Sequence, residues 1–265
     1  MVFGKLLSRF KSEAAQEPST PEGVRLYVVG DIHGRDDLLE SLIGDIEQDG
    51  MLYPDRRKII VFLGDYVDRG LQSRQVIERL CGPMPEGFEA VFLKGNHELA
   101  MLQFLGDAQF GRTWKYYGGL ETLHSYGINE MMLTDDPRDF DLARARLAEE
   151  MPEHHRSFLV GLGLSAEFGD YFFAHAGVRP GVALGDQVED DLLWIRDEFL
   201  RSRNSFGKVV VHGHTPSEEV VFRANRIGID TGAYMTGVLT CLVLDGTERG
   251  LLQTGEQMVR TANVQ

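Results

Sequence analysis

Residues 58–70 read KIIVFLGDYVDRG and join five consecutive large apolar side chains to a polar cluster. An apolar run of this length, rich in β-branched residues, predicts a buried strand. Asp65 follows the predicted strand directly, where a carboxylate is destabilised unless it is paired or bound to a metal ion. The alternative for this segment alone is a surface ion pair between aspartate and Arg69, which contributes little to stability.

The same order of apolar run and polar cluster occurs at four other places. VRLYVVG leads into Asp31, EAVFLKG into Asn96, DYFFA into His175 and KVVV into His212. A helical pattern at 36–46 lies between the first two strands, so we expect a largely parallel sheet with helices on a face. Because ligands bind outside the carboxyl ends of strands in such sheets, the polar clusters are expected to meet there.

The rest of the chain divides into segments of different character. Residues 1–22 are expected to form a flexible tail, followed by one domain over 23–265. Within the domain, residues 103–160 predict a mostly helical insert over the sheet edge. Residues 194–202 predict a helix, and 220–246 predict antiparallel strands joined by glycine-containing turns.

Composition excludes several classes of protein. The 265 residues are 43% hydrophobic, enough for a full core, and the net charge of -14 argues against nucleic-acid binding. No apolar run reaches the roughly 18 residues of a membrane span, so we expect a cytoplasmic protein without stable membrane association. Cys81 and Cys241 form no CxxC pair, which excludes a zinc ribbon and favours buried free thiols.

Histidines are concentrated in the polar clusters. Five of the eight lie there, whereas His124, His154 and His155 lie in the insert and are expected to be surface or structural residues. A single histidine after a strand is more often a core residue than a ligand, but five clusters together favour a metal site. Aspartate, asparagine and histidine ligands without cysteine suit Mn²⁺, Fe or Zn²⁺.

Two clusters point to particular chemistry. Asp31 and His33, two residues apart at a strand exit, can both reach one metal ion. Asn96 offers a neutral oxygen ligand, and it could cap a helix beginning at Glu98, either in place of this role or in addition to it. His97 is able to act as a general acid near neutral pH.

The motifs GDIHG, GDYVDRG, GNHE, HAG and HGHTP, in this order over roughly residues 24–245, resemble the metallophosphoesterases. The second and third resemble the bacterial and phage phosphoprotein phosphatases in particular. The resemblance implies an α/β fold, a two-sheet αββα sandwich. It also implies two divalent metal ions, Mn²⁺ before Fe or Zn²⁺, with Asp65 bridging them. The implied ligands of the first ion are Asp31 and His33, and those of the second are Asn96, His175 and His214.

The resemblance also implies a catalytic and a phosphate-binding group. His97, oriented by Asp68, would protonate the leaving oxygen. Arg69 would bind the phosphate, with Arg196 as a second arginine from the LLWIRDEFL segment, and Asn96 would also lie against the substrate.

The sequence departs from the wider pattern at three positions. Pro216 replaces a second histidine, which leaves the first ion with one protein ligand fewer. His212 precedes the matching histidine and is expected outside the ligand set. Arg226 stands where eukaryotic members are expected to have a tyrosine.

The function implied is hydrolysis of phosphoserine or phosphothreonine in proteins, or of both these and phosphotyrosine, by a hydroxide held between two metal ions. One alternative is a symmetrical diadenosine tetraphosphate hydrolase, although those enzymes typically have alanine at the position of Asp68 and GNHD in place of GNHE. A second is a non-catalytic metal-binding scaffold on the same fold. The expected partner is a phosphorylated protein or peptide.

Overall fold

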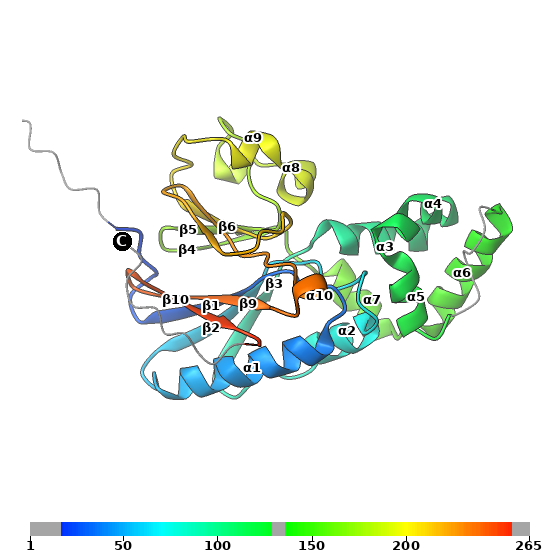
Figure 1. Ribbon diagram of the computed structural model, residues 1–265, viewed down its shortest axis with the longest axis horizontal. Helices are drawn as coiled ribbons and strands as arrows, with labels where there is room; N and C mark the ends of the chain where they lie inside the picture. Colours follow the sequence, from blue (N-terminus) through cyan, green and yellow to red (C-terminus); the bar gives the residue numbers. More distant parts are fainter. Residues whose placement is uncertain (1–16, 129–135, 256–265) are drawn as a thin grey trace, which may run out of the picture.

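Two five-stranded sheets pack face to face, and helices cover their outer faces. A computed structural model describes residues 17–128 and 136–255 (Figure 1). The space between the sheets is filled by apolar side chains from both, including Leu26, Val61 and Leu242 from one and Phe173 and Val211 from the other. The expected αββα sandwich is therefore confirmed.

The first sheet is largely parallel and contains the first three predicted strands. Its order is β10-β9-β1-β2-β3, with β1 parallel to β2 and β2 parallel to β3. The two C-terminal strands join antiparallel beside β1. The bounds are Val24–Val29 for β1, Arg57–Phe62 for β2, Phe88–Phe92 for β3, Thr240–Asp245 for β9 and Glu248–Gln253 for β10.

The second sheet has the order β4-β5-β6-β8-β7, with β5, β6 and β8 parallel. Its bounds are Ser165–Phe168 for β4, Tyr171–Ala174 for β5, Val209–His212 for β6, Val221–Phe222 for β7 and Arg226–Gly228 for β8. The antiparallel strands expected at 220–246 exist, but β7 and β8 belong to this sheet and β9 to the other. The helix α10, Ala233–Thr236, lies between β8 and β9 in the chain.

Each sheet has its own helices. In Figure 1, α1 (Asp36–Met51) and α2 (Ser73–Cys81) lie below the first sheet, whereas α8 (Glu189–Trp194) and α9 (Asp197–Leu200) lie above the second. The prediction of a single helix over 194–202 is wrong, because the helical conformation is interrupted at Arg196, where φ is -131° and ψ is -99°. The break separates two short helices and places Arg196 at their junction.

The expected insert is helical in its described residues. Helix α3 (Asn96–Gly106) leads into the insert, whose α-helices are α4 (Gly111–Trp114), α5 (Gly119–Ser125), α6 (Pro137–Glu150) and α7 (Glu153–Val160). Phe158 of α7 packs against Phe92 of the edge strand β3, with ring centroids 5.1 Å apart. Trp114 and Phe140 share one core cluster with Tyr27 and Phe62, so the insert is part of the same packed domain.

The N-terminal segment is attached to the domain before β1 begins. Residues 1–16 of the expected tail lie outside the described residues. The backbone N–H of Ser19 donates to the Asp170 carboxylate over 2.9 Å, and that of Thr20 donates to the Gly246 carbonyl over 3.0 Å. Within the described ranges, no helix is both long and apolar enough to cross a membrane, and both cysteines are free thiols.

Candidate metal centre

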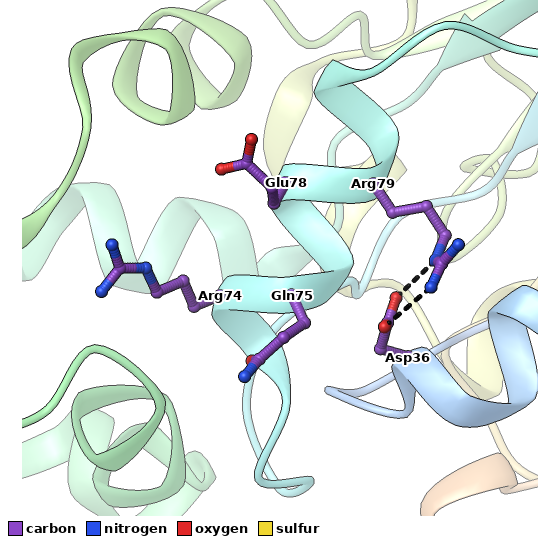
Figure 2. Close-up of a pocket in the computed structure, with 5 residues that line it drawn as sticks. All are labelled: Asp36, Arg74, Gln75, Glu78 and Arg79. Carbon is purple, nitrogen blue, oxygen red and sulfur yellow. Dashed lines mark hydrogen bonds and ion pairs between the residues drawn. The ribbon is translucent and has the colours of Figure 1, made fainter.

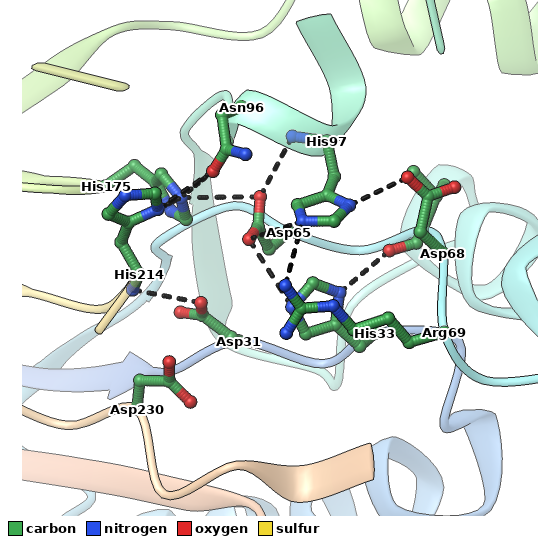
Figure 3. A network of polar contacts seen from close by, with 12 residues as sticks. Asp31, His33, Asp65, Asp68, Arg69, Asn96, His97, His175, His214 and Asp230 are labelled. Atoms are coloured by element: carbon green, nitrogen blue, oxygen red, sulfur yellow. Dashed lines mark hydrogen bonds and ion pairs between the residues drawn. The ribbon is translucent and has the colours of Figure 1, made fainter. Parts of the chain in front are cut away.

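The expected polar clusters meet at the carboxyl ends of the strands. Figure 3 shows side chains from the ends of β1, β2, β5 and β6 converging on Asp65, together with residues that begin α3. All are buried, with exposed fractions of 5% or less. The residues brought together are Asp31, His33, Asp65, Asp68, Asn96, His97, His175 and His214. We refer to this group as the metal centre.

The backbone of the centre is strained. Every non-glycine residue of the described ranges with a positive φ lies here: His33 (47°), Asp65 (54°), Asp68 (72°), Arg69 (68°) and His214 (64°). Such a conformation is disfavoured by about 1–3 kcal/mol per residue and persists only where the surroundings impose it. Five such residues at one place indicate that the fold holds these side chains in a fixed geometry.

Glu98 imposes much of this geometry. Its carboxylate accepts backbone N–H groups from Asp65 (2.8 Å), Tyr66 (2.7 Å), Val67 (3.2 Å) and Gly95 (2.8 Å). A Cβ atom on Gly95 would overlap the Asp65 carboxylate. The fully buried Glu98 therefore joins the loop after β2 to the start of α3.

Asn96 does not cap a helix, so that alternative is wrong. Helix α3 begins at Asn96 itself, with Gly95 as the N-cap residue. The Asn96 side-chain oxygen lies 2.9 Å from His175 Nε2 and 2.9 Å from His214 Nδ1. The amide thus faces the two histidines, as expected of a ligand.

The histidine tautomers fit a bound cation. His175 Nδ1 lies 3.0 Å from the Leu63 carbonyl oxygen, which can only accept, so Nδ1 bears the proton. In neutral His175 the Nε2 lone pair then faces two further acceptors, Asn96 Oδ1 and, at 3.4 Å, Asp65 Oδ1. This arrangement is repulsive unless a cation lies between the atoms, as in metal-bound histidines.

His33 repeats this arrangement on the other side of Asp65. Its Nδ1 lies 2.9 Å from the Val67 carbonyl oxygen, so its Nε2 lone pair faces Asp65 Oδ2 at 3.4 Å. Asp31 Oδ1 is buried without a hydrogen-bond partner. Two groups of potential ligands share Asp65: His33–Asp65–His97 and Asp65–His175–His214, each with ligand atoms within 4.8 Å of one another. The residues therefore fit two ions that would share Asp65 as a ligand.

The electrostatics agree with this fit. Burial lowers the pKa of His33 to about 3 and that of His214 to about 2, and it also lowers the pKa of His175. All three are thus neutral, the form that binds metals.

His97 is bonded differently from the other histidines. Its Nδ1 lies 2.7 Å from Asp68 Oδ2, and Asp68 also accepts from Trp114 Nε1 (2.9 Å) and Thr122 Oγ1 (2.6 Å). Burial would lower the pKa of His97, but the charge of Asp65 and the hydrogen bond to Asp68 raise it overall. The insert supplies Trp114 and Thr122, a role that no sequence motif indicated.

The two arginines lie at different depths. Arg69 Nη2 is 3.4 Å from His97 Nε2. Arg196 is exposed, and its charge, after burial, is among the causes that lower the pKa of His175 and His214. Arg69 therefore lies beside His97, whereas Arg196 acts on His175 and His214 through its charge.

Two predictions about the second sheet had different outcomes. His212 lies outside the ligand groups, as expected: its Nδ1 faces the Gly213 carbonyl at 3.0 Å and its ring packs on Phe199. Arg226 does not stand at the centre. Its Nη2 donates to the Leu200 carbonyl over 2.9 Å, and its guanidinium lies 5.9 Å from the Phe199 ring.

Sequence reasoning missed Tyr234 and Asp230. The Tyr234 ring centroid is 5.5 Å from that of His33, and the Arg69 guanidinium lies 4.9 Å from the Tyr234 ring. Asp230 is buried near Asp31, and burial raises its pKa to about 6. The signal was present, because Asp230 lies two residues after the end of β8, just as Asp31 lies two residues after the end of β1.

Two more aromatic rings border the centre. The Tyr117 ring lies 5.9 Å from His97 and 6.0 Å from Trp194, and the Trp194 ring lies 6.3 Å from His214. With Tyr234, aromatic surface therefore lines the centre next to His33, His97 and His214.

Comparison with known proteins agrees with the fold. Residues 24–236 match the family model of the calcineurin-like phosphoesterases. An asymmetrical bis(5'-nucleosyl)-tetraphosphatase, PrpE of Anoxybacillus flavithermus, is 28% identical over 235 residues, which cover 81% of this chain and 88% of that protein. Serine/threonine-protein phosphatase 2 of Escherichia coli is 28% identical over 224 residues, covering 81% and 90%.

Solved structures show the same fold at lower identity. A putative diadenosine tetraphosphatase superposes with a TM-score of 0.60 at 20% identity, covering 91% of this chain and 100% of that one. A cold-active protein tyrosine phosphatase gives a TM-score of 0.57 at 17% identity, covering 92% and 82%.

Proposed function

The chain belongs to the calcineurin-like phosphoesterase family, and from this premise we propose that it is a protein phosphatase acting on phosphoserine and phosphothreonine. The reaction transfers the phosphoryl group to water, so the products are the free hydroxyl side chain and inorganic phosphate. The observation that carries the proposal is the 2.7 Å contact between His97 Nδ1 and Asp68 Oδ2.

That contact matters because of the leaving group. A serine or threonine alkoxide is a poor leaving group, and a general acid that protonates it accelerates its departure by about 10²–10⁴-fold. Asp68 holds the Nδ1 proton of His97 and directs Nε2 toward the centre. A nucleoside polyphosphate departs as a stable anion and has less need of this acid.

The ligand set supports two divalent ions. One would be held by Asp31, His33 and Asp65, and the other by Asp65, Asn96, His175 and His214. Nitrogen and oxygen ligands without sulfur favour Mn²⁺, with Fe or Zn²⁺ as alternatives. Bound there, the ions would lower the pKa of water and neutralise charge on the phosphate oxygens.

The arginines would orient the substrate. A phosphate bound by Arg69 would lie beside His97, because Arg69 Nη2 is 3.4 Å from His97 Nε2. Arg196 would bind from the side of His214. Water attacks phosphorus opposite the ester oxygen, the P–O bond breaks, and His97 gives its Nε2 proton to the departing oxygen.

A second candidate is hydrolysis of dinucleoside tetraphosphates. The name of the Anoxybacillus relative supports it, and that relative is named asymmetrical, not symmetrical. The rings of Tyr117, Trp194 and Tyr234 beside the centre could stack on a nucleobase.

The test compares leaving groups in one experiment. Wild type, His97→Ala and the exposed control His124→Ala are assayed with Mn²⁺ on a phosphoserine peptide, on p-nitrophenyl phosphate and on diadenosine tetraphosphate. We expect His97→Ala to lose about 10²–10⁴-fold on the peptide and far less on p-nitrophenyl phosphate, whose phenolate leaves readily.

Three outcomes would change the proposal. Higher wild-type kcat/KM on the dinucleotide, with ATP and AMP as products, would favour the second candidate. Equal losses on both monoesters would remove the acid role of His97. Full metal binding without turnover of any substrate would favour a non-catalytic scaffold.

A further inference from the structure

A second cluster of histidines and a carboxylate lies away from the metal centre. Glu78 of α2 faces His154 and His155 of α7, and we call these three residues the α2–α7 cluster. Glu78 Oε2 lies 3.1 Å from His154 Nε2 and 2.8 Å from His155 Nε2. Their ligand atoms all lie within 4.8 Å of one another. Two imidazoles thus converge on one carboxylate oxygen.

The Tyr126 hydroxyl holds the His155 ring in place through the ring nitrogen that does not face Glu78. The His155 side chain is fully buried, and its Nδ1 lies 2.9 Å from the Tyr126 hydroxyl. A hydroxyl can donate or accept, so Tyr126 stabilises either tautomer of His155. With the proton on Nδ1, the Nε2 lone pair points at the position shared with Glu78 and His154, as in metal-bound histidines.

The helices that carry the three residues are packed against the core. Val76, Ile77 and Leu80 of α2 and Leu159 of α7 are buried, so the spacing of the two helices is set by the core. The positions of Glu78 and His155 therefore do not depend on flexible loops.

The cluster opens to solvent on the Glu78 side. Glu78 borders a surface pocket of about 430 Å³ that Asp36, Arg74, Gln75 and Arg79 also line (Figure 2). In Figure 2 the Glu78 carboxylate points away from the bidentate Asp36–Arg79 ion pair, so it is free to face α7. Side-chain exposures of 62% for Glu78 and 53% for His154 leave room for solvent ligands.

We propose that Glu78, His154 and His155 bind a Zn²⁺ ion that joins α2 to α7. Two imidazole nitrogens and one carboxylate form a common zinc ligand set, with solvent in the remaining position. Cys81 belongs to no ligand group, and its Sγ lies 3.8 Å from the backbone carbonyl oxygen of His154.

The local charge permits the ion. Asp36 neutralises Arg79, and Glu78 supplies a negative charge directly at the site. The positive charge of Arg74, whose guanidinium lies 5.7 Å from the Tyr126 ring, repels a cation. The net charge of -14 on the chain attracts cations and opposes this repulsion. His154 lies at the surface, so it can be replaced without opening the core.

The test counts zinc ions and uses the full chain. Wild type, Glu78→Gln, His154→Ala and the control His124→Ala are dialysed against the same micromolar Zn²⁺, and zinc per chain is measured by atomic emission. We expect Glu78→Gln and His154→Ala to hold one zinc ion fewer than wild type and His124→Ala. Equal zinc content in all four proteins overturns the proposal.

A second measurement tests whether the ion joins the helices. Zn²⁺ should slow amide hydrogen exchange in α7, Glu153–Val160, at least several-fold in wild type and in His124→Ala, but not in His154→Ala. Unchanged exchange in wild type would overturn the joining role. The metal centre is intact in all four proteins, so a failure of the proposed phosphatase activity leaves both comparisons valid.

Discussion

The metal centre and the α2–α7 cluster use similar side chains in different settings. At the centre every ligand is buried, and Asp65, His33 and His214 have positive φ angles. At the α2–α7 cluster, Glu78 and His154 are more than half exposed, and all three residues lie in helices without positive φ angles. One site depends on the fold to hold it, whereas the other is a contact between two regular helices.

The two sites differ in how rigidly the protein holds their side chains before a metal ion binds. The centre keeps carboxylate oxygens and imidazole lone pairs close together without relaxation, because Glu98 and the backbone carbonyls of Leu63 and Val67 restrain them. Such preorganisation suits catalysis, since no reorganisation is needed during the reaction. The α2–α7 cluster can relax by turning Glu78 or His154 into solvent, so its effect on the empty protein should be small.

The largest effect is expected for Asp65→Asn at the centre. Asparagine has the same shape and tolerates positive φ, so the loop should remain folded. Loss of the charge shared by both ligand groups should reduce kcat/KM by at least about 10³-fold, equivalent to about 4 kcal/mol of transition-state stabilisation. Metal content by atomic emission and turnover of a phosphoserine peptide measure this. Activity within tenfold of wild type would contradict the bridging role.

The next largest effect is expected for Glu98→Gln. The amide NH₂ would face backbone N–H donors that now bond to a carboxylate, and leaving two buried donors unpaired should destabilise the fold by about 3–5 kcal/mol. Urea denaturation measures the free energy of unfolding, with the exposed Glu149→Gln as a control expected to change it little. A loss as small as that of the control would mean that the strained loop does not depend on Glu98.

The metal centre was predictable because its residues are tied to strand ends. Asp31, Asp65, His175 and His214 each lie one to three residues after the end of a short apolar strand, and the parallel arrangement of those strands brings their ends together. Buried strands need continuous apolar residues, and the tight turns after them need glycines such as Gly95. Both requirements are visible in a single sequence.

Contacts between distant segments were not predictable in this way. Trp114 and Thr122 bond to Asp68 only because the insert folds back over the loop after β2. No helix-breaking residue stands at the break at Arg196, and Ile195 and Phe199 on either side of it are buried in one cluster of the tertiary core. His154 and His155 looked like surface or structural residues because Glu78, their partner, is 76 residues away from His154 in the chain.

A smaller effect, and one that depends on pH, is expected for Asp68→Asn. The hydrogen bond to Asp68 helps to raise the pKa of His97, so the neutral amide should lower that pKa. The general acid must be protonated, and a lower pKa means that it loses its proton at lower pH. The alkaline limb of kcat/KM for a phosphoserine peptide should therefore move to lower pH, with a maximal rate about 10–100-fold below wild type. If the alkaline limb of the variant's pH profile lies at the same pH as that of wild type, Asp68 does not control the pKa of the general acid.

The smallest effect is expected for His154→Ala in protein freed of zinc. The residue is 53% exposed and its bond to Glu78 is open to solvent, so the melting temperature should change by less than about 2 °C. With Zn²⁺ present, only wild type should gain the extra stability of an ion that binds the folded chain at this cluster. Differential scanning calorimetry with and without Zn²⁺ measures both values. A large loss without zinc would show that the α2–α7 cluster is as firmly built into the fold as the metal centre, and the contrast between the two sites would disappear.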